Sequence, residues 1–350
     1  MTDAAVSRPR AFRATAAAHL VGQAAKAAWW TAAGSAGRAL VRPGAARGYT
    51  PQSPPPPPNV LRRAYLAAFA KDAADVAAGL YPVHEPAVSP VELGRRFADL
   101  IADAREVEAR RGREAQGATE ARDEPESRGR PAYYRQNFHF QTGGWFTTES
   151  ARRYEAQVEA LFAGAAGPMR RRALSVLARA WRGRDQRELT VVDVACGSGA
   201  FTRDLRAAFP RATVFGLDLS QAYLAEAERR SGAPGVQAAA ERLPFADASL
   251  DALTCVYLFH ELPPRVRSEV AAEFARVLKP GGVLAFADSL QASDAPELAR
   301  PLESFPVYFH EPYYRSYQDT DLPALFGQVG LALEATDTAF FTKALLLRKA

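Results

Sequence analysis

The sequence predicts an α/β fold with a mostly parallel sheet in its C-terminal part, preceded by a helical N-terminal extension. From about residue 189 onward, short apolar runs alternate with helical patterns, which is typical of parallel strands joined by helices. Before that point, apolar residues recur at helical spacing in residues 60–80 and again in residues 90–113. A proline run at 54–58 and a charged stretch at 114–130 interrupt the pattern and are interpreted as linkers.

These breaks divide the 350-residue chain into three expected regions. Residues 1–58 are expected to form a disordered, basic and proline-rich tail, residues 59–150 a helical accessory and lid region, and residues 151–350 the α/β domain. The tail contains seven Arg and Lys side chains and one acidic side chain, so it accounts for the net charge of +5 of the whole chain. The rest of the chain is close to neutral, which gives no electrostatic reason to expect nucleic-acid binding.

The composition of residues 1–50 leaves two interpretations open, because disordered tails and organellar transit peptides share it. Residues 19–41 are interrupted by charged residues and glycines, so we expect no stable membrane insertion. The two cysteines, Cys196 and Cys255, fall in predicted core segments, which indicates a reducing compartment, and they lack the spacing of metal ligands. We therefore expect a cytoplasmic protein without a metal site, or an organelle-matrix protein if residues 1–50 are a transit peptide.

A glycine turn follows the first strand of the predicted sheet. The β-rich run 189–195 leads into Cys-Gly-Ser-Gly at 196–199 and then into a helical pattern, which lets the backbone approach a ligand at the carboxyl edge of a sheet. Asp193, at the end of this strand, can order the turn or contact cationic groups of a ligand through water. Its carboxylate would repel a pyrophosphate. Thr202 stands where a dinucleotide-binding fingerprint has its third glycine, which weakens NAD binding as the alternative.

A second acidic residue ends the next strand. Residues 213–218 form an apolar run that finishes with Asp218. A carboxylate at this edge is placed to accept hydrogen bonds from both hydroxyls of a ribose. The alternative is a loop aspartate that caps the following helix, but Ser220 fills that position better.

Four sequence motifs occur in a fixed order between about residues 185 and 290. They are Val-Asp-Val-Ala-Cys-Gly-Ser-Gly (192–199), Gly-Leu-Asp-Leu-Ser (216–220), Glu-Arg-Leu-Pro-Phe (241–245) with Asp247 and Asp251, and Arg-Val-Leu-Lys-Pro-Gly-Gly (276–282). In this order they resemble the class I S-adenosylmethionine (SAM)-dependent methyltransferases, in particular the branch of ubiquinone/menaquinone C-methyltransferases. The resemblance implies SAM as the cofactor, and a Rossmann-like, doubly wound, seven-stranded sheet whose antiparallel last strand falls within residues 331–350.

The resemblance also assigns cofactor contacts position by position. They are Asp193, Ala195, Gly197 and Gly199 at the methionine end, Asp218 at the ribose hydroxyls, Leu219, Ala240 and Glu241 at the adenine, and Val256 or Tyr257 at the amino-acid part. Two positions depart from the family pattern. Ala195 replaces a glycine, and Ala239 stands where many members have an aspartate that receives the adenine amino group, so that contact must come from the backbone or from another side chain.

Methyl transfer is an in-line displacement that depends mainly on positioning, and many such enzymes add a base that removes a proton from the acceptor. His260, just beyond the strand predicted at 252–257, is the expected general base. Glu261, next to it, is expected to orient or ionise the imidazole. The alternative is a histidine that only packs or forms hydrogen bonds at this position.

Two aromatic-rich segments, residues 133–146 and 305–314, are expected to form a lid and an apolar acceptor pocket. The alternative is a hydrophobic plug under a loop. The candidate substrate-binding residues are Tyr133, Trp145, Phe309, His310 and Tyr313. The expected acceptor is a small apolar or aromatic molecule such as a quinol, a phenol or a lipid. An NAD-dependent oxidoreductase and a non-catalytic SAM-binding protein are the alternatives from other functional classes.

Overall fold

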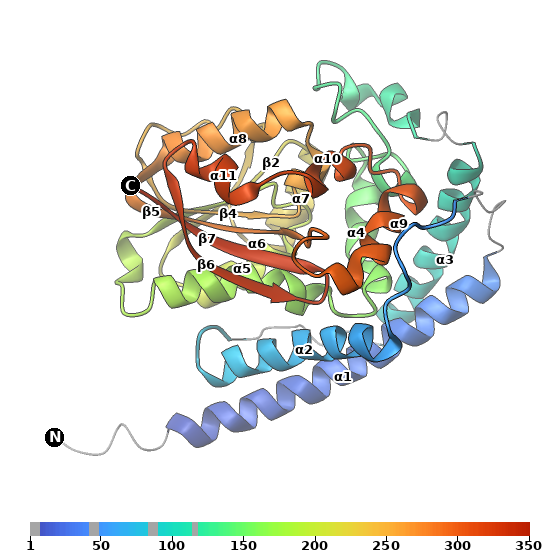
Figure 1. The fold of residues 1–350 in the computed structure, drawn as a ribbon, viewed down its shortest axis with the longest axis horizontal. Coiled ribbons are helices and arrows are strands. Elements are labelled where there is room, and N and C mark those ends of the chain that lie inside the picture. Colours follow the sequence, from blue (N-terminus) through green and yellow to red (C-terminus); the bar gives the residue numbers. More distant parts are fainter. Residues whose placement is uncertain (1–7, 42–48, 83–89, 114–117) are drawn as a thin grey trace.

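A seven-stranded sheet forms the centre of the protein, in the strand order β3-β2-β1-β4-β5-β7-β6 (Figure 1). The computed structural model describes residues 8–41, 49–82, 90–113 and 118–350. Strands β1 to β5 pair in parallel, and β7 is antiparallel to β5 and to β6, so the predicted doubly wound fold with an antiparallel last strand is confirmed. The strands are β1 (Thr190–Val194), β2 (Thr213–Asp218), β3 (Gly235–Gln237), β4 (Leu250–Val256), β5 (Leu278–Ser289), β6 (Leu331–Ala339) and β7 (Thr342–Lys349).

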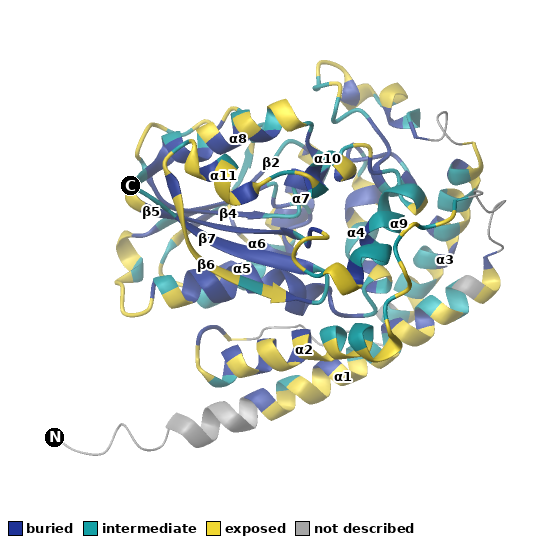
Figure 2. Ribbon diagram, viewed as in Figure 1, coloured by how far each residue is buried: buried dark blue, intermediate teal, exposed yellow. Residues whose placement is uncertain are grey.

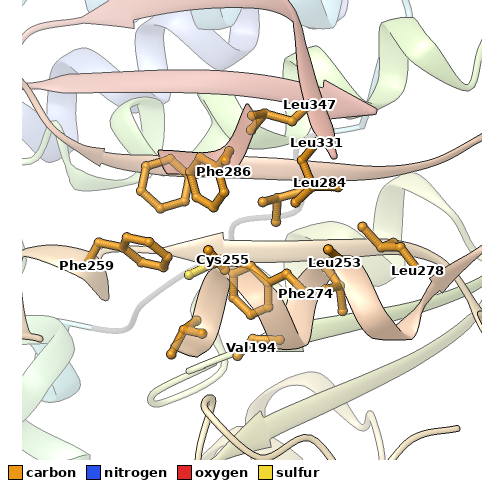
Figure 3. Packing of buried hydrophobic residues seen from close by; sticks show 14 of the residues in the cluster. Val194, Leu253, Cys255, Phe259, Phe274, Leu278, Leu284, Phe286, Leu331 and Leu347 are labelled. Carbon is orange, nitrogen blue, oxygen red and sulfur yellow. The ribbon is translucent and has the colours of Figure 1, made fainter. Parts of the chain in front are cut away.

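Helices cover both faces of this sheet (Figure 1). On one face, Phe274 of α8 and Phe326 of α11 pack into the main buried cluster, and Figure 3 shows the ring of Phe274 beside Leu253 and Cys255 of β4. On the other face, α5 and α6 supply a second buried cluster. The helices of this part are α4 (Thr148–Leu161), α5 (Ala166–Ala180), α6 (Ala200–Ala208), α7 (Gln221–Ser231), α8 (Pro264–Val277), α9 (Ala299–Tyr308), α10 (Tyr314–Gln318) and α11 (Leu322–Gly327).

Strand β1 lies in the middle of the parallel part of the sheet. Its Val192 pairs with Phe215 of β2 on one side and with Leu253 of β4 on the other. Strands β1, β4, β5 and β7 are buried along most of their length, as Figure 2 shows for β4 and β7. Because parallel strands end at the same edge of a sheet, the segments that follow β1, β2 and β4 meet there.

The N-terminal extension is helical and packs against the α/β part. Its helices α1 (Arg8–Leu40) and α2 (Pro58–Ala77) contact each other, and α2 also contacts α5. Residues 90–113, expected to be helical, contain α3 (Pro90–Gly112). No helix among the described residues combines the length and the apolar composition needed to cross a bilayer.

The expectation of a disordered tail is wrong for α1. Trp30 and Ala33 of this helix are buried in a cluster with Ala156 of α4, and Phe97 and Leu100 of α3 pack against it. Tertiary packing of an apolar face stabilises a helix that composition alone does not reveal. Residues 1–7 and 42–48 of the predicted tail, and 114–117 of the predicted linker, lie outside the described residues. The boundaries of the three proposed regions stay a prediction.

A buried charge network holds the extension on the α/β part. Asp72 of α2 accepts two hydrogen bonds from Arg171 of α5, at 2.8 and 2.7 Å, and its Oδ2 lies 2.7 Å from Nε2 of His19 in α1. Asp72 is fully buried and Arg171 is 2% exposed. Burial alone would raise the pKa of Asp72, but the charge and hydrogen bonds of Arg171 and His19 outweigh it, and the pKa lies below its usual value. Three elements distant in sequence are therefore joined by one ionised carboxylate.

Candidate active site

The turn after β1 has the left-handed backbone that its glycines allow. Ala195, Gly197 and Gly199 have φ angles of 56°, 54° and 77°. A Cβ atom on Gly199 would lie 2.6 Å from the Cα of Ala227 in α7, so this glycine is required by the close approach of two helices. Gly199 lies behind the turn and does not line the cavity described below, whereas Ala195 and Gly197 do.

Asp193 holds this turn from inside the sheet. Its two carboxylate oxygens accept hydrogen bonds from Thr202 Oγ1 at 2.5 Å and from Thr254 Oγ1 at 2.7 Å. Burial raises the pKa of Asp193 to about 6, against the opposing effect of these two hydrogen bonds. The side chain does not line the cavity. Of the two roles that the sequence leaves open for Asp193, ordering the turn is the one that matches this geometry.

Asp218 stands at the end of β2 and faces the turn. Its Oδ2 accepts a hydrogen bond from the backbone N–H of Gly197 at 2.9 Å, and its Oδ1 accepts one from that of Ser220 at 2.8 Å. Ser220 caps α7 by accepting a hydrogen bond from the N–H of Tyr223, which is the capping role expected for it. Burial raises the pKa of the Asp218 carboxyl, and the backbone hydrogen bonds oppose this effect. A carboxylate fixed in this way can accept further hydrogen bonds from ligand hydroxyls.

A cavity of about 100 Å³ lies between these groups and the lid. On the sheet side it is lined by Ala195, Gly197, Asp218, Leu219, Ala240, Val256 and Tyr257, seven of the ten residues predicted to contact the cofactor. Glu241 does not line it, because its carboxylate accepts hydrogen bonds from the hydroxyl of Tyr133 at 2.8 and 2.9 Å. The opposite side is lined by Tyr133, Tyr134, Phe138 and Trp145 of the segment 133–146, by Tyr154 of α4 and by Tyr223 of α7.

The residues around this cavity fit SAM. Gly197 leaves open space where a side chain would stand, since no atom lies within 4 Å of its Cβ position. Asp218 supplies an ionisable acceptor for hydroxyls. On the lid side, Nε1 of Trp145 is buried and has no hydrogen-bond partner among the described residues, which leaves a donor for a ligand. The aromatic side chains of the lid also exclude water from the site.

A second, larger cavity of about 620 Å³ adjoins the first. Tyr154, Tyr257 and Glu261 line both cavities and form the wall between them. Most of the other lining side chains are apolar and come from several helices and from the turn between β6 and β7. They are Val41, Tyr65, Leu100, Val107, Val158, Leu161, Phe162, Met169, Leu302, Phe305, Phe309, Phe340 and Phe341.

The five predicted substrate-binding residues do not lie together: they are found in the larger cavity, in the smaller cavity, and at the contact between the two aromatic segments. Phe309 lines the larger cavity, but Tyr133 and Trp145 line the smaller one. His310 and Tyr313 line neither: Nε2 of His310 lies 2.8 Å from Oε1 of Gln136, and the amide of Gln136 donates to the hydroxyl of Tyr313 at 3.2 Å. These two residues attach the lid to the segment 305–314, so the expected contact between the two aromatic segments is present.

Comparison with known proteins agrees with this geometry. The family described as "Methyltransferase domain" matches residues 192–286, which contain the turn, Asp218 and the strand that ends at the cavity wall. The chain therefore contains, within these residues, a domain of the class I SAM-dependent methyltransferase family. The cofactor of this family is SAM.

Several curated proteins are similar to part of this chain. A ubiquinone/menaquinone biosynthesis C-methyltransferase of Desulfotalea psychrophila is 40% identical over 26% of this chain and 38% of its own length. A fatty-acid O-methyltransferase of Mycolicibacterium smegmatis is 37% identical over 33% of this chain and 43% of its own length. A phthiotriol/phenolphthiotriol dimycocerosates methyltransferase of Mycobacterium ulcerans is 35% identical over 33% of this chain and 44% of its own length. The chain thus spans less than half the length of these relatives.

Among solved structures, magnesium protoporphyrin IX methyltransferase of Synechocystis is 18% identical, with 53% of this chain and 85% of that chain covered and a TM-score of 0.42. The fold assignment rests on the strand order of the sheet and not on this similarity.

His260 lies in the larger cavity, next to Glu261 of the wall between the two cavities. Its Nδ1 is 2.5 Å from Oδ1 of Asp288, and the other oxygen of Asp288 accepts a hydrogen bond from the N–H of Phe259 at 2.8 Å. Burial by itself would lower the pKa of His260, but the charge of Asp288 and the hydrogen bond to it raise the pKa to about 9. With Nδ1 held by Asp288, Nε2 is the nitrogen left to exchange a proton.

Asp288 and Tyr154 are site residues that the sequence analysis missed. Asp288 is the acidic residue near the end of β5, and an acid at the carboxyl end of a strand beside β4 is a signal that sequence reasoning can use. Tyr154 lies on α4, and none of the sequence motifs includes it. Its place in the wall between the cavities follows from how α4 crosses the edge of the sheet, which no local pattern indicates.

Asp218→Asn is expected to raise the dissociation constant of SAM about 10- to 100-fold, because hydrogen bonds to a charged group contribute about 1.5–3 kcal/mol. The amide keeps the size of the side chain but loses the charge that accepts from the ribose hydroxyls. Isothermal titration calorimetry measures the change. Asp185→Asn is the matched control, since Asp185 precedes η4 (Gln186–Glu188), before the opposite end of β1. An unchanged affinity in Asp218→Asn contradicts the assignment.

Proposed function

We propose that this methyltransferase transfers a methyl group from SAM to a small apolar molecule, such as a quinol, a phenol or a lipid. The observation that supports this is the pair of adjoining cavities whose common wall is formed by Tyr154, Tyr257 and Glu261. The turn and Asp218 would hold the cofactor in the smaller cavity, and the acceptor would bind in the larger one. Bound SAM supplies an electrophilic methyl group on a sulfonium sulfur.

The protein's own residues have three tasks in this reaction. The glycine turn and Asp218 orient the cofactor, and the aromatic lid excludes water, so that the reacting groups are held in line. His260 acts as the general base in its neutral form, whose Nε2 takes the proton that the acceptor loses on methylation. Because the pKa of His260 is raised to about 9, this neutral form, and with it kcat, is expected to increase as the pH rises toward 9. Asp288 keeps the imidazole in the required orientation and stabilises the protonated ring that forms.

The size and composition of the larger cavity support an apolar acceptor. Apolar pockets of several hundred Å³ enclose most of the surface of a drug-sized ligand. Relatives of this chain are named for fatty acids, for phthiotriol and phenolphthiotriol dimycocerosates, and for ubiquinone and menaquinone biosynthesis. The described part of the extension adds Val41, Tyr65 and Leu100 to the lining, so this extension contributes to the choice of acceptor.

Location in the cytoplasm stays a prediction, and Cys196 and Cys255 form no disulfide.

Incubation of the full chain with methyl-labelled SAM and a panel of quinols, phenols and long-chain fatty acids tests the proposal. Transfer of label to at least one apolar acceptor is the expected result. Such turnover excludes a non-catalytic SAM-binding protein. Binding of labelled NAD in place of SAM would instead favour an oxidoreductase, and the absence of transfer to every apolar member of the panel contradicts the proposed acceptor class.

Leu302→Trp is expected to raise KM for a long-chain acceptor at least about 10-fold, since apolar contacts of this size contribute about 1–3 kcal/mol to discrimination. Leu302 of α9 is buried and lines the larger cavity, so the indole would occupy space needed by the acceptor. The dissociation constant of SAM is expected to stay unchanged. Leu333→Trp, at an exposed position of β6, is the control. Equal KM values in the two variants would show that the acceptor binds elsewhere.

A further inference from the structure

Three titratable side chains from distant segments meet beside the wall between the cavities. His139 lies in the lid, Glu261 follows β4, and Glu311 lies between α9 and α10. One imidazole nitrogen and one carboxylate oxygen from each glutamate all lie within 4.8 Å of one another. Glu261 lines both cavities and His139 lines the larger one. The cluster is therefore reached from the space where the acceptor is proposed to bind.

The two carboxylates of this cluster lack the partners that buried charges normally have. Glu311 is 3% exposed, and neither of its carboxylate oxygens has a hydrogen-bond partner among the described residues. No Lys or Arg of the described part of the chain forms an ion pair with Glu261 or Glu311. The basic groups next to them are the imidazoles of His139, whose Nε2 lies 2.5 Å from Oε1 of Glu311, and of His260. Adjacent carboxylates, one of which is buried, are costly unless a cation neutralises them.

We propose that His139, Glu261 and Glu311 bind one divalent transition-metal ion of the Mn²⁺ or Zn²⁺ type. One imidazole and two carboxylates form a donor set that suits these ions, and their two negative charges balance the charge of the ion. Three protein ligands leave coordination positions open, as in catalytic metal sites. The separation of 2.5 Å between His139 and Glu311 must open to roughly 3 Å, because ligands of one ion stand about 2.1 Å from it.

Because His139 and Glu261 line the larger cavity, an oxygen of an acceptor bound there would reach the ion. A bound cation orients such an oxygen and makes its hydroxyl more acidic. The contact between the ion and the acceptor depends on the proposed methyl transfer. Binding of the ion to the protein does not depend on it. The sequence predicted no metal site because its two cysteines lack the spacing of metal ligands. The ligands proposed here are residues 139, 261 and 311, which only the tertiary structure brings together.

Titration of the chelator-treated full chain with Mn²⁺, followed by electron paramagnetic resonance, tests the site without SAM or acceptor. We expect one ion per chain with a dissociation constant in the micromolar range. Glu311→Gln and His139→Gln are each expected to weaken binding about 10- to 100-fold or to abolish it. Glu188→Gln, an exposed position before β1, is expected to bind like the unmodified protein. A parallel titration with Zn²⁺ by calorimetry compares the two ions.

Thermal unfolding provides a second measurement that does not depend on activity. Mn²⁺ is expected to raise the Tm of the unmodified chain but not that of Glu311→Gln, because the ion binds only the folded site. Circular dichroism shows whether Glu311→Gln and His139→Gln are folded. If Glu311→Gln is not folded, His139→Gln provides the test. Absence of saturable binding to the unmodified chain, or equal binding by both variants and Glu188→Gln, overturns the site. Neither result affects the test of methyl transfer, which is measured separately.

Discussion

Replacement of His260 by alanine is expected to lower kcat about 100- to 10,000-fold, the range that a positioned general base contributes. The imidazole lies in the acceptor cavity with its Nδ1 held by Asp288, so its removal takes away the group that accepts the proton. The dissociation constant of SAM is expected to stay the same, because His260 does not line the smaller cavity. Steady-state kinetics with the best acceptor of the panel, together with calorimetry for SAM, measures both quantities.

Rescue by added imidazole separates a base from a packing residue. In His260→Ala the lost ring leaves space inside the acceptor cavity, and free imidazole that enters it should restore part of kcat. Asp288→Asn is expected to reduce kcat less, because the base is kept and only its orientation and the stabilisation of its protonated form are weakened. Full turnover in His260→Ala would rule out the general base and leave His260 as a packing residue.

Arg171→Leu is expected to reduce the free energy of unfolding by about 3–5 kcal/mol, because it leaves the buried Asp72 without its main partner. His19 and the hydroxyl of Tyr81, which donates to Asp72 at 2.9 Å, remain but do not replace the two hydrogen bonds from the guanidinium. Urea unfolding followed by circular dichroism gives the difference. The extension is expected to separate first, since Asp72 lies on α2 and Arg171 on α5.

Arg187→Leu is the control, because it breaks an exposed ion pair with Asp185 and is expected to cause no measurable change in stability. The effect of Arg171→Leu also depends on pH. Since the pKa of Asp72 is lower in the folded protein than in the unfolded chain, its stabilisation is complete above about pH 4 and is lost as the pH falls further. The difference between the unmodified chain and Arg171→Leu should therefore narrow in acid. A difference that is constant from pH 7 to pH 3 contradicts the role of Asp72.

The cofactor half of the site could be predicted because its determinants are local. The turn at 196–199 follows directly from β1, and Asp218 ends β2, so the parallel pairing of β1 with β2 is enough to bring them together. Two of the predicted cofactor contacts, Asp193 and Gly199, do not line the smaller cavity. Asp193 and Gly199 belong to the turn in sequence, but one is bonded to Thr202 and Thr254 behind it and the other contacts α7.

The acceptor half could not be predicted in the same way, because its residues come from segments far apart in the chain. Trp145 and Phe309 both belong to aromatic segments, yet they line different cavities. Glu311 is one acid among 39 acidic residues in the sequence, and only its burial next to Glu261 and His139 distinguishes it. Helix α1 could not be predicted for a similar reason: its apolar residues are sparse, and their burial depends on α3 and α4.

The sequence by itself determined the fold class, the family and the edge of the sheet that binds the cofactor, since strand periodicity and a glycine turn act over a few consecutive residues. Tertiary structure alone decided the shape of the acceptor cavity, the pairing of His260 with Asp288, the position of the N-terminal helices and the cluster of His139 with two glutamates. The physical reason is that burial and the pairing of charges depend on which side chains meet in space, and that is fixed only when the helices and the sheet pack together.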